Sequence, residues 1–112
     1  MARAPPLSLD EALQQGSLGK WEFYSAVTGS DWWGADLGMG QVHPFKITPD
    51  NLGKIHKAAW RLRKNYGPSH PIPGVAAYYA GDFKAIDAAY RERNCKKMQE
   101  AVWDLLTSIV CE

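Results

Sequence analysis

The chain has 112 residues, which is enough for one domain with its own core and too few for two. Hydrophobic residues make up 46% of the sequence and charged residues 22%, which is typical of a globular domain and excludes a chain that is disordered throughout. The chain has thirteen Lys and Arg residues and twelve Asp and Glu residues, so its net charge is +1. So small a net charge excludes long-range electrostatic attraction of the whole molecule to nucleic acid.

The first predicted element is a short helix. Ser8 and Glu11 fit a capping box, in which the Ser8 side chain caps the helix and the Glu11 side chain reaches back to the Ser8 amide. This pattern predicts a helix over residues 9–15 that ends at Gly16. Residues 17–27 suit either a helix or a strand, and we favour a helix because no convincing second strand is present to pair with it.

A glycine-rich stretch follows. Residues 29–44 contain four glycines and the adjacent pair Trp32 and Trp33. Such glycine density disfavours long regular elements, whereas two tryptophans are unusual in a disordered linker. We therefore expect an ordered loop near residues 29–44 that packs on the rest of the domain.

The clearest helical signal covers residues 49–66. Thr48 suits the N-cap, Pro49 suits the first helical position, and the pair Gly67–Pro68 provides a stop. An apolar stripe with spacings of three and four lies between these ends: Leu52, Ile55, Ala59, Leu62 and Tyr66.

The C-terminal part of the chain predicts further helices. Residues 75–80 form a short helix that Gly81 ends, and Asp82 caps the next helix. From Asn94 onwards the pattern is helical again or continues the preceding helix. Its apolar face contains Met98, Ala101, Val102, Leu105 and Ile109, with Trp103, Leu106 and Val110 beside it. This arc spans about half of the helix circumference, more than one neighbouring helix covers, so we expect the last helix to be central to the fold or shared with a second chain.

Together these elements predict an all-α fold: one compact bundle of about four or five helices over residues 1–112, with residues 1–7 flexible. The N-terminus lacks the apolar run of a secretory signal, and no window approaches the length of a membrane-spanning helix, so we expect a cytoplasmic protein. Cys95 and Cys111 are too far apart along a helix to bridge within it, and we expect reduced thiols, although a disulfide between two chains stays open.

The charge of the chain is concentrated on the helix predicted at 49–66. This segment carries five basic residues against Asp50 alone, and four of them recur at helical spacing: Lys54, Lys57, Arg61 and Lys64. An ordinary amphipathic helix also places charged residues outwards, and Lys and Arg are good helix formers. The functional interpretation is a docking face for an acidic partner.

Trp60 lies between the apolar stripe and this basic face. Its ring either folds over the edge of the core or anchors an interface flanked by cations. Five Trp and five Tyr residues are many for so short a chain, which favours contact with another protein. The candidate partner-binding residues are Lys57, Trp60, Arg61 and Lys64 on this helix and Trp103, Leu106 and Val110 on the last one.

No pattern points to catalysis. The sequence has no nucleophile elbow, no complete phosphate-binding loop and no clustered metal-ligand spacing. We therefore expect a protein that is not an enzyme and that has no cofactor, no metal site and no catalytic residues.

Two resemblances add to this interpretation. Residues 77–90 resemble part of a tetratricopeptide repeat, with paired aromatics and a Gly-Asp-aromatic step; because the motif does not recur, it implies a helix–turn–helix corner and not a repeat domain. In length, helical content and an apolar, Trp-bearing helix, the chain is similar to small bacterial quorum-sensing anti-activators of the QslA type. That resemblance implies a protein that binds a transcriptional regulator and blocks its dimerisation.

The sequence therefore predicts a non-catalytic regulator that binds and blocks or sequesters another protein, such as a transcription factor, and that forms a homodimer through its last helix. The alternative is a nucleic-acid-binding regulator that uses the basic face of helix 49–66. Against the alternative, the chain has no second basic element and no known nucleic-acid-binding module.

Overall fold

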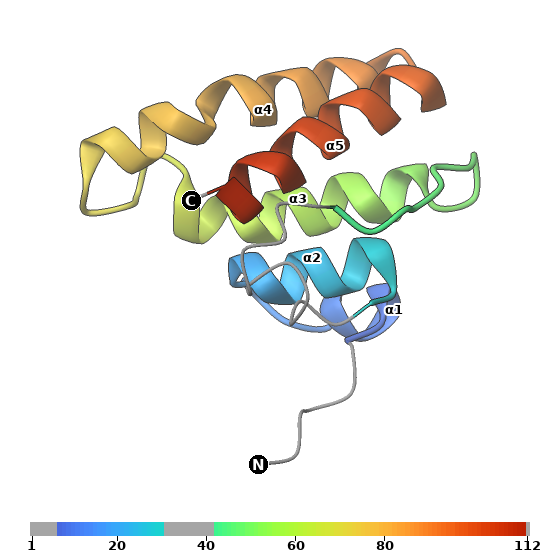
Figure 1. The fold of residues 1–112 in the computed structure, drawn as a ribbon, viewed down its shortest axis with the longest axis horizontal. Helices are drawn as coiled ribbons and strands as arrows, with labels where there is room; N and C mark the ends of the chain where they lie inside the picture. The colour runs from blue at the N-terminus through green and yellow to red at the C-terminus, as the bar shows by residue number, and fades with distance from the viewer. Residues whose placement is uncertain (1–6, 31–41, 112) are drawn as a thin grey trace.

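The computed structural model describes residues 7–30 and 42–111, and these residues form helices and connecting segments without a strand (Figure 1). The five helices are α1 (Leu9–Ala12), α2 (Lys20–Thr28), α3 (Leu52–Tyr66), α4 (Pro73–Arg91) and α5 (Cys95–Cys111). The prediction of an all-α bundle of four or five helices is confirmed. Most of the loop expected near 29–44, including Trp32 and Trp33, lies outside the described residues.

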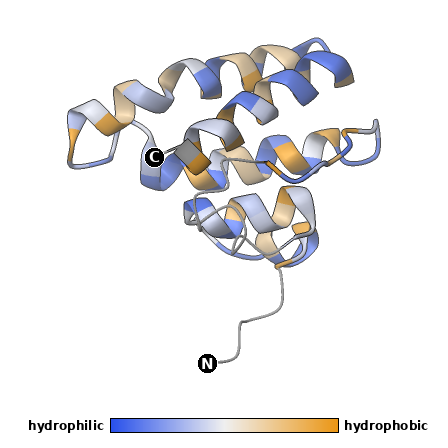
Figure 2. Cartoon of the chain, viewed as in Figure 1, coloured by the Kyte–Doolittle hydropathy of each residue, from blue (hydrophilic) through white to orange (hydrophobic). Residues whose placement is uncertain are grey.

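Helix α3 lies between two groups of helices. It contacts α1 and α2 on one side and α4 on another, while α5 packs along α4 (Figure 1). Helices α3, α4 and α5 run antiparallel, each to the one before it. Every helix contributes to one buried cluster, whose most deeply buried large side chains include Tyr24, Tyr79, Phe23, Leu18, Ile55, Leu62 and Ile86. The alternation of apolar and polar residues that places these side chains inwards is visible in Figure 2.

The capping box at the N-terminus is confirmed. The Glu11 amide donates to Ser8 Oγ over 3.1 Å, and the Ser8 amide donates to Glu11 Oε1 over 3.2 Å. Helix α1 is shorter than predicted, because the chain beyond it continues as turns with bonds to carbonyls three residues back. Leu7, expected to be flexible, is held: its amide donates to Ser25 Oγ over 2.9 Å and its side chain packs against the core.

The uncertain segment 17–27 is helical from Lys20 onwards, and none of it is a strand. Its helix, α2, ends at Gly29, whose φ of 72° is left-handed and favours glycine. Helix α3 begins at Leu52, three residues later than predicted. Thr48 and Asn51 exchange hydrogen bonds between amide and side chain, over 2.8 and 3.3 Å, and these bonds shape a turn that precedes the helix.

The predicted break at Gly81 and Asp82 is wrong, and α4 is one helix of 19 residues. Tyr79 and Phe83, on either side of the glycine, are both buried, and a straight helix is what points them into the same core. A mid-helix glycine costs about 1 kcal/mol, less than the burial of two aromatic rings provides. The helix–turn–helix corner implied by the tetratricopeptide resemblance is therefore wrong too.

The wide apolar arc of α5 is covered within one chain. Met98, Val102, Leu105, Leu106 and Ile109 are 0–1% exposed. Helix α4 packs along α5, and Val42 and Ile47, from the segment before α3, belong to the same buried cluster as these residues. The Gln99 side chain fixes this segment to α5: it accepts from the Ile47 amide over 3.0 Å and donates to the Phe45 carbonyl over 2.9 Å.

Candidate functional site

Some of the basic side chains of α3 are bonded to neighbouring segments and others are not. Lys54 Nζ lies 2.9 Å from Oδ1 of Asp10, in α1. Arg61 Nη2 donates to the Leu13 carbonyl over 3.1 Å, and the Arg61 carbonyl accepts from the Leu18 amide. Two of the four aligned cations therefore hold the N-terminal segment onto α3.

The remaining cations of α3 are not bonded to the described part of the N-terminal segment. Lys57 and Lys64 are exposed, and neither makes an ion pair with any residue in 7–30 or 42–111. Arg63 also has no carboxylate partner within those ranges, and its guanidinium carbon lies 5.6 Å from the centre of the Trp60 ring. Helix α3 itself contains no acidic residue, so the exposed Lys57 and Lys64 and the partly exposed Arg63 are three positive charges without an ion-pair partner in the described segments.

Trp60 belongs to a continuous stack of five side chains across α3 and α4. Arg63 lies over one side of the indole, and the His56 ring is stacked 4.6 Å from it at 27°. Tyr90, from α4, is stacked 3.9 Å from His56 at 12°. Arg93 completes the stack, with its guanidinium carbon 4.0 Å from the Tyr90 ring. Aromatic and cation–π contacts of this kind each contribute about 0.5–1.5 kcal/mol.

Asp87 fixes the middle of this stack. Its carboxylate lies 3.2 Å from His56 Nε2 and 2.9 Å from Arg91 Nε. From the same helix, Phe83 meets the Trp60 ring edge-on, with centroids 6.3 Å apart at 79°. The indole is therefore held in place from several directions while part of it stays exposed.

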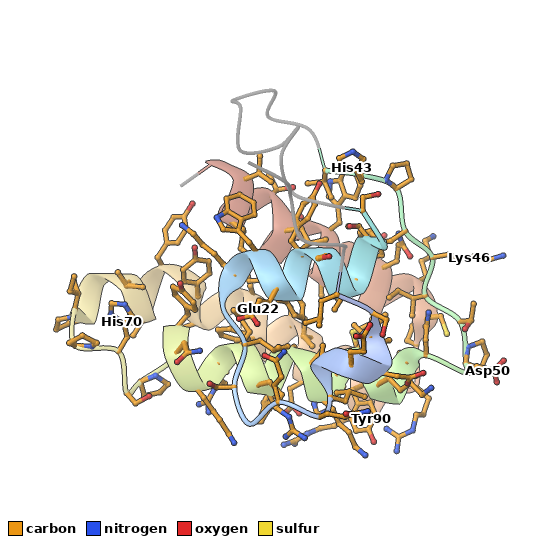
Figure 3. The ribbon with its side chains drawn as sticks, turned by 90° about the horizontal axis from the view of Figure 1, so that it is seen from below. Glu22, His43, Lys46, Asp50, His70 and Tyr90 are labelled. Atoms are coloured by element: carbon orange, nitrogen blue, oxygen red, sulfur yellow. The ribbon has the colours of Figure 1, made fainter. Side chains whose placement is uncertain are left out.

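Two hollows meet at Trp60. The first is a groove of about 360 Å³ between α3 and α4. It is lined by Trp60, Arg63, Gly67, Pro68, Ala76, Ala77, Ala80, Phe83, Lys84 and Asp87. The second hollow, of about 400 Å³, lies at the end of α3 and is lined by Trp60, Arg61, Arg63, Lys64, Pro68 and Ser69. Figure 3 labels His70 and Tyr90 at the two ends of the α3–α4 pair; the groove begins at the end near the His70 loop and extends along α4 as far as Asp87.

The structure brings some of the predicted partner-binding residues together. Trp60, Arg61 and Lys64 surround the second hollow, and Lys57 lies one helical turn earlier on α3. Arg61 lines the hollow but is also tied to the Leu13 carbonyl, and its Nε is buried without a hydrogen-bond partner among the described residues.

The candidates on α5 do not join this site. Trp103 is 43% exposed and stacks on Phe45, with centroids 6.1 Å apart at 22°. Val110 is partly buried against the core. Leu106 is 0% exposed, so its selection as a contact residue is corrected: it has no surface to offer to a partner in this fold.

Sequence reasoning identified Trp60 but missed the other residues that line the groove. Arg63 stands three residues after Trp60, a spacing that places the two on the same side of a helix. Ala76, Ala77 and Ala80 share one side of α4 in the same way, and small residues leave room beside a neighbouring aromatic ring. These signals were in the sequence, but pairing them required knowledge of how α3 and α4 pack.

Other functional chemistry has little support in the described part of the chain. Within residues 7–30 and 42–111 no three His, Cys, Asp or Glu side chains gather as a set of metal ligands. Burial raises the pKa of Asp82 above its usual range and the nearby charge of Asp104 adds to this, while a hydrogen bond from Ser108 opposes it. Asp82 is not among the residues that line the groove. In the described segments, no helix combines the length and the apolar character needed to cross a membrane.

Comparison with known proteins finds no match: no protein-family model, no curated protein and no solved structure is significantly similar to this chain.

Proposed function

We propose that the chain is a non-catalytic binding protein that acts on another protein through the surface formed by α3 and α4. We call this the Trp60 surface; its residues are Lys57, Trp60, Arg63, Lys64, Phe83 and Lys84. The observation that carries the proposal is the partly exposed Trp60 ring, fixed by stacking, at the meeting point of two hollows with uncompensated cations around them.

The composition of this surface is that of a protein-binding site. Trp and Arg are the residue types most enriched among the side chains that dominate binding energy. The stack also removes the entropic cost that a freely rotating indole would add on binding, because Trp60 already occupies one position. Exposed Lys and Arg around an apolar centre match the usual arrangement of a charged rim around a desolvated core.

Nucleic-acid binding through α3 is the weaker candidate. Of the four aligned cations, Lys54 and Arg61 are engaged by Asp10 and by the Leu13 carbonyl. A phosphate backbone needs several free cations along one path, whereas the Trp60 surface has an apolar centre with Asp87 in its wall.

The effect on the partner protein follows from the proposed binding. A small protein without a catalytic site exerts an effect on its partner by occupying a surface that the partner needs. The resemblance to anti-activators favours a transcriptional regulator as that partner, blocked in its own dimerisation. Self-association stays a separate proposal, which now depends on the exposed Trp103 and its stack with Phe45, since Leu106 is buried.

The test is affinity capture from the native cell extract, after nuclease treatment, with quantitative identification of the retained proteins. The variant is Lys57→Glu/Lys64→Glu, which reverses two exposed charges of the Trp60 surface. The matched control is Lys46→Glu/Lys96→Glu, with the same change in net charge at exposed sites outside α3; Figure 3 shows Lys46 projecting from the segment before α3.

We expect a defined protein to be retained by the wild type and the control and lost by the α3 variant. Retention that vanishes on nuclease treatment would support nucleic-acid binding instead. Equal retention by both variants would contradict the proposed surface.

A further inference from the structure

We propose that the groove between α3 and α4 receives an acidic amphipathic helical segment of the partner protein. Large apolar side chains of that segment pack in the groove against the wall formed by Trp60 and Phe83, and its carboxylates meet Arg63, Lys64 and Lys84. This inference rests on the proposed protein-binding function and names the chemistry of the partner.

The apolar part of the groove fits a side chain inserted from outside. Trp60 and Phe83 form one wall, and Ala76, Ala77 and Ala80 provide a low floor on α4. The first half of α4 is pale to orange in Figure 2, because small apolar residues replace the charged ones expected on an exposed helix. The groove has a volume of about 360 Å³, equivalent to roughly twelve waters at ~30 Å³ each, which is enough for large apolar side chains.

The charges around the groove select an acidic occupant. Arg63, Lys64 and Lys84 make no ion pair with any residue in 7–30 or 42–111. The single carboxylate in the groove wall, Asp87, is already engaged by Arg91 and His56. Carboxylates that approach this rim therefore find three cations free to pair, and partial exclusion of water by the partner strengthens those pairs.

The shape of the site favours a helix over the other forms that a partner segment can take. The groove is half open, whereas a small-molecule site encloses most of its ligand. The described residues offer no strand edge to which an extended peptide could add. An amphipathic helix that lies between two helices places apolar side chains at spacings of three and four into the groove and its charged residues along the rim.

One segment of the chain itself has this chemistry. On α5, Trp103 is exposed between the exposed residues Glu100 and Asp104. A second copy could insert this face into the groove, but such a head-to-tail contact leaves the groove of one copy and the α5 face of the other free, and it propagates into an open chain of copies unless the rotation closes a ring. We therefore assign the groove to a different protein and treat self-association as an outcome to be tested.

The experiment selects peptides from a phage-displayed library of random segments of about 16 residues, roughly four helical turns, against the folded full chain. Selected peptides are then titrated onto the wild type and two variants. Ala80→Glu places a carboxylate at an exposed position in the groove, and Ala88→Glu places one at an exposed position of the same helix outside the groove lining. Circular dichroism confirms that both variants are folded.

We expect selected peptides in which Leu, Ile, Phe or Trp recur at spacings of three and four among Asp and Glu. Ala80→Glu should weaken their binding by about tenfold or more, and Ala88→Glu by much less. Affinity should also fall as salt increases, because the rim contributes through exposed charges. Basic or neutral selected peptides, or equal affinity for the two variants, would overturn the inference. So would a concentration-dependent mass that Ala80→Glu and Trp103→Ala both reduce to that of a monomer.

The same variants separate this inference from the function on which it rests. If the captured partner protein binds Ala80→Glu as well as wild type but is lost by Lys57→Glu/Lys64→Glu, the protein-binding function stands and the groove is not its site. If neither variant affects capture, both proposals fail.

Discussion

A substitution at Leu106 distinguishes whether the apolar arc of α5 packs in the core of one chain or forms an interface between two. The residue is 0% exposed in a single chain, so replacing it with alanine removes an isopropyl group from a closed core. The lost transfer energy is about 2–2.5 kcal/mol, and the cavity left behind raises the total to about 3 kcal/mol. A domain of this size has a total stability of about 5–15 kcal/mol, so Leu106→Ala should remain folded and be clearly weakened.

The assay is equilibrium unfolding in urea, followed by circular dichroism, with the mass measured by light scattering at the same protein concentration. With a slope of about 1–3 kcal/mol per molar urea, a loss of about 3 kcal/mol should lower the midpoint by about 1–3 M. Val110→Ala, one turn further along α5 and only partly buried, is the matched control and should cost less than about 1.5 kcal/mol.

An unchanged midpoint together with a fall from a dimeric to a monomeric mass would refute the reasoning. That result would mean that Leu106 faces a second copy of the chain and not its own core. A lowered midpoint with no change of mass is the outcome that the single-chain burial predicts.

Three further predictions concern the fold. Gly81→Ala should raise the free energy of unfolding by about 0.5–1 kcal/mol, because Gly81 is exposed within α4 with open space beside it. Gly29→Ala should lower the free energy of unfolding, because Gly29 has a φ of +72°. Thermal melting measures the stability of both variants. Gln99→Ala should lower the stability by about 1–3 kcal/mol in urea unfolding, because the amide of Ile47 and the carbonyl of Phe45 lose their partner; normal stability would show that segment 42–47 is held by other contacts. Asp82 has a raised pKa, so its folded form binds a proton more readily than its unfolded form, and its destabilising effect grows as the pH rises through that pKa. Asp82→Asn should therefore be more stable than wild type at pH 7 and lose this advantage near pH 3, whereas a difference that grows towards acid pH would contradict the sign.

Local signals predicted the helices whose ends are set by nearby residues. The Ser8 and Glu11 side chains cap α1 as expected, and the regular spacing from Leu52 to Tyr66 identified α3. Gly81 shows the limit of this approach. The preference of one glycine for a break is weak, and the core that accepts Tyr79 and Phe83 from one straight helix is formed by residues distant in sequence.

The candidate site was predictable only in part, for the same reason. Helical spacing placed Trp60 beside the basic residues of α3. Which cations remain free depends on where α1 lies, because Lys54 and Arg61 are engaged by residues 44 and 48 positions earlier. The burial of Leu106 likewise depends on tertiary packing: Val42 and Ile47 belong to the same buried cluster, and Gln99 bonds their segment to α5 across 52 residues of sequence.

The most direct test of the Trp60 surface is hydroxyl-radical footprinting of the chain, free and bound to the protein that it captures. The method compares three aromatic side chains in one sample: Trp60 in the groove, Trp103 on α5 and Tyr78 on α4, the last two 43% and 54% exposed. The account predicts that oxidation of Trp60 falls sharply in the complex while that of Trp103 stays unchanged. Protection of Trp103 with unchanged oxidation of Trp60 would place the interface on α5 and contradict the account.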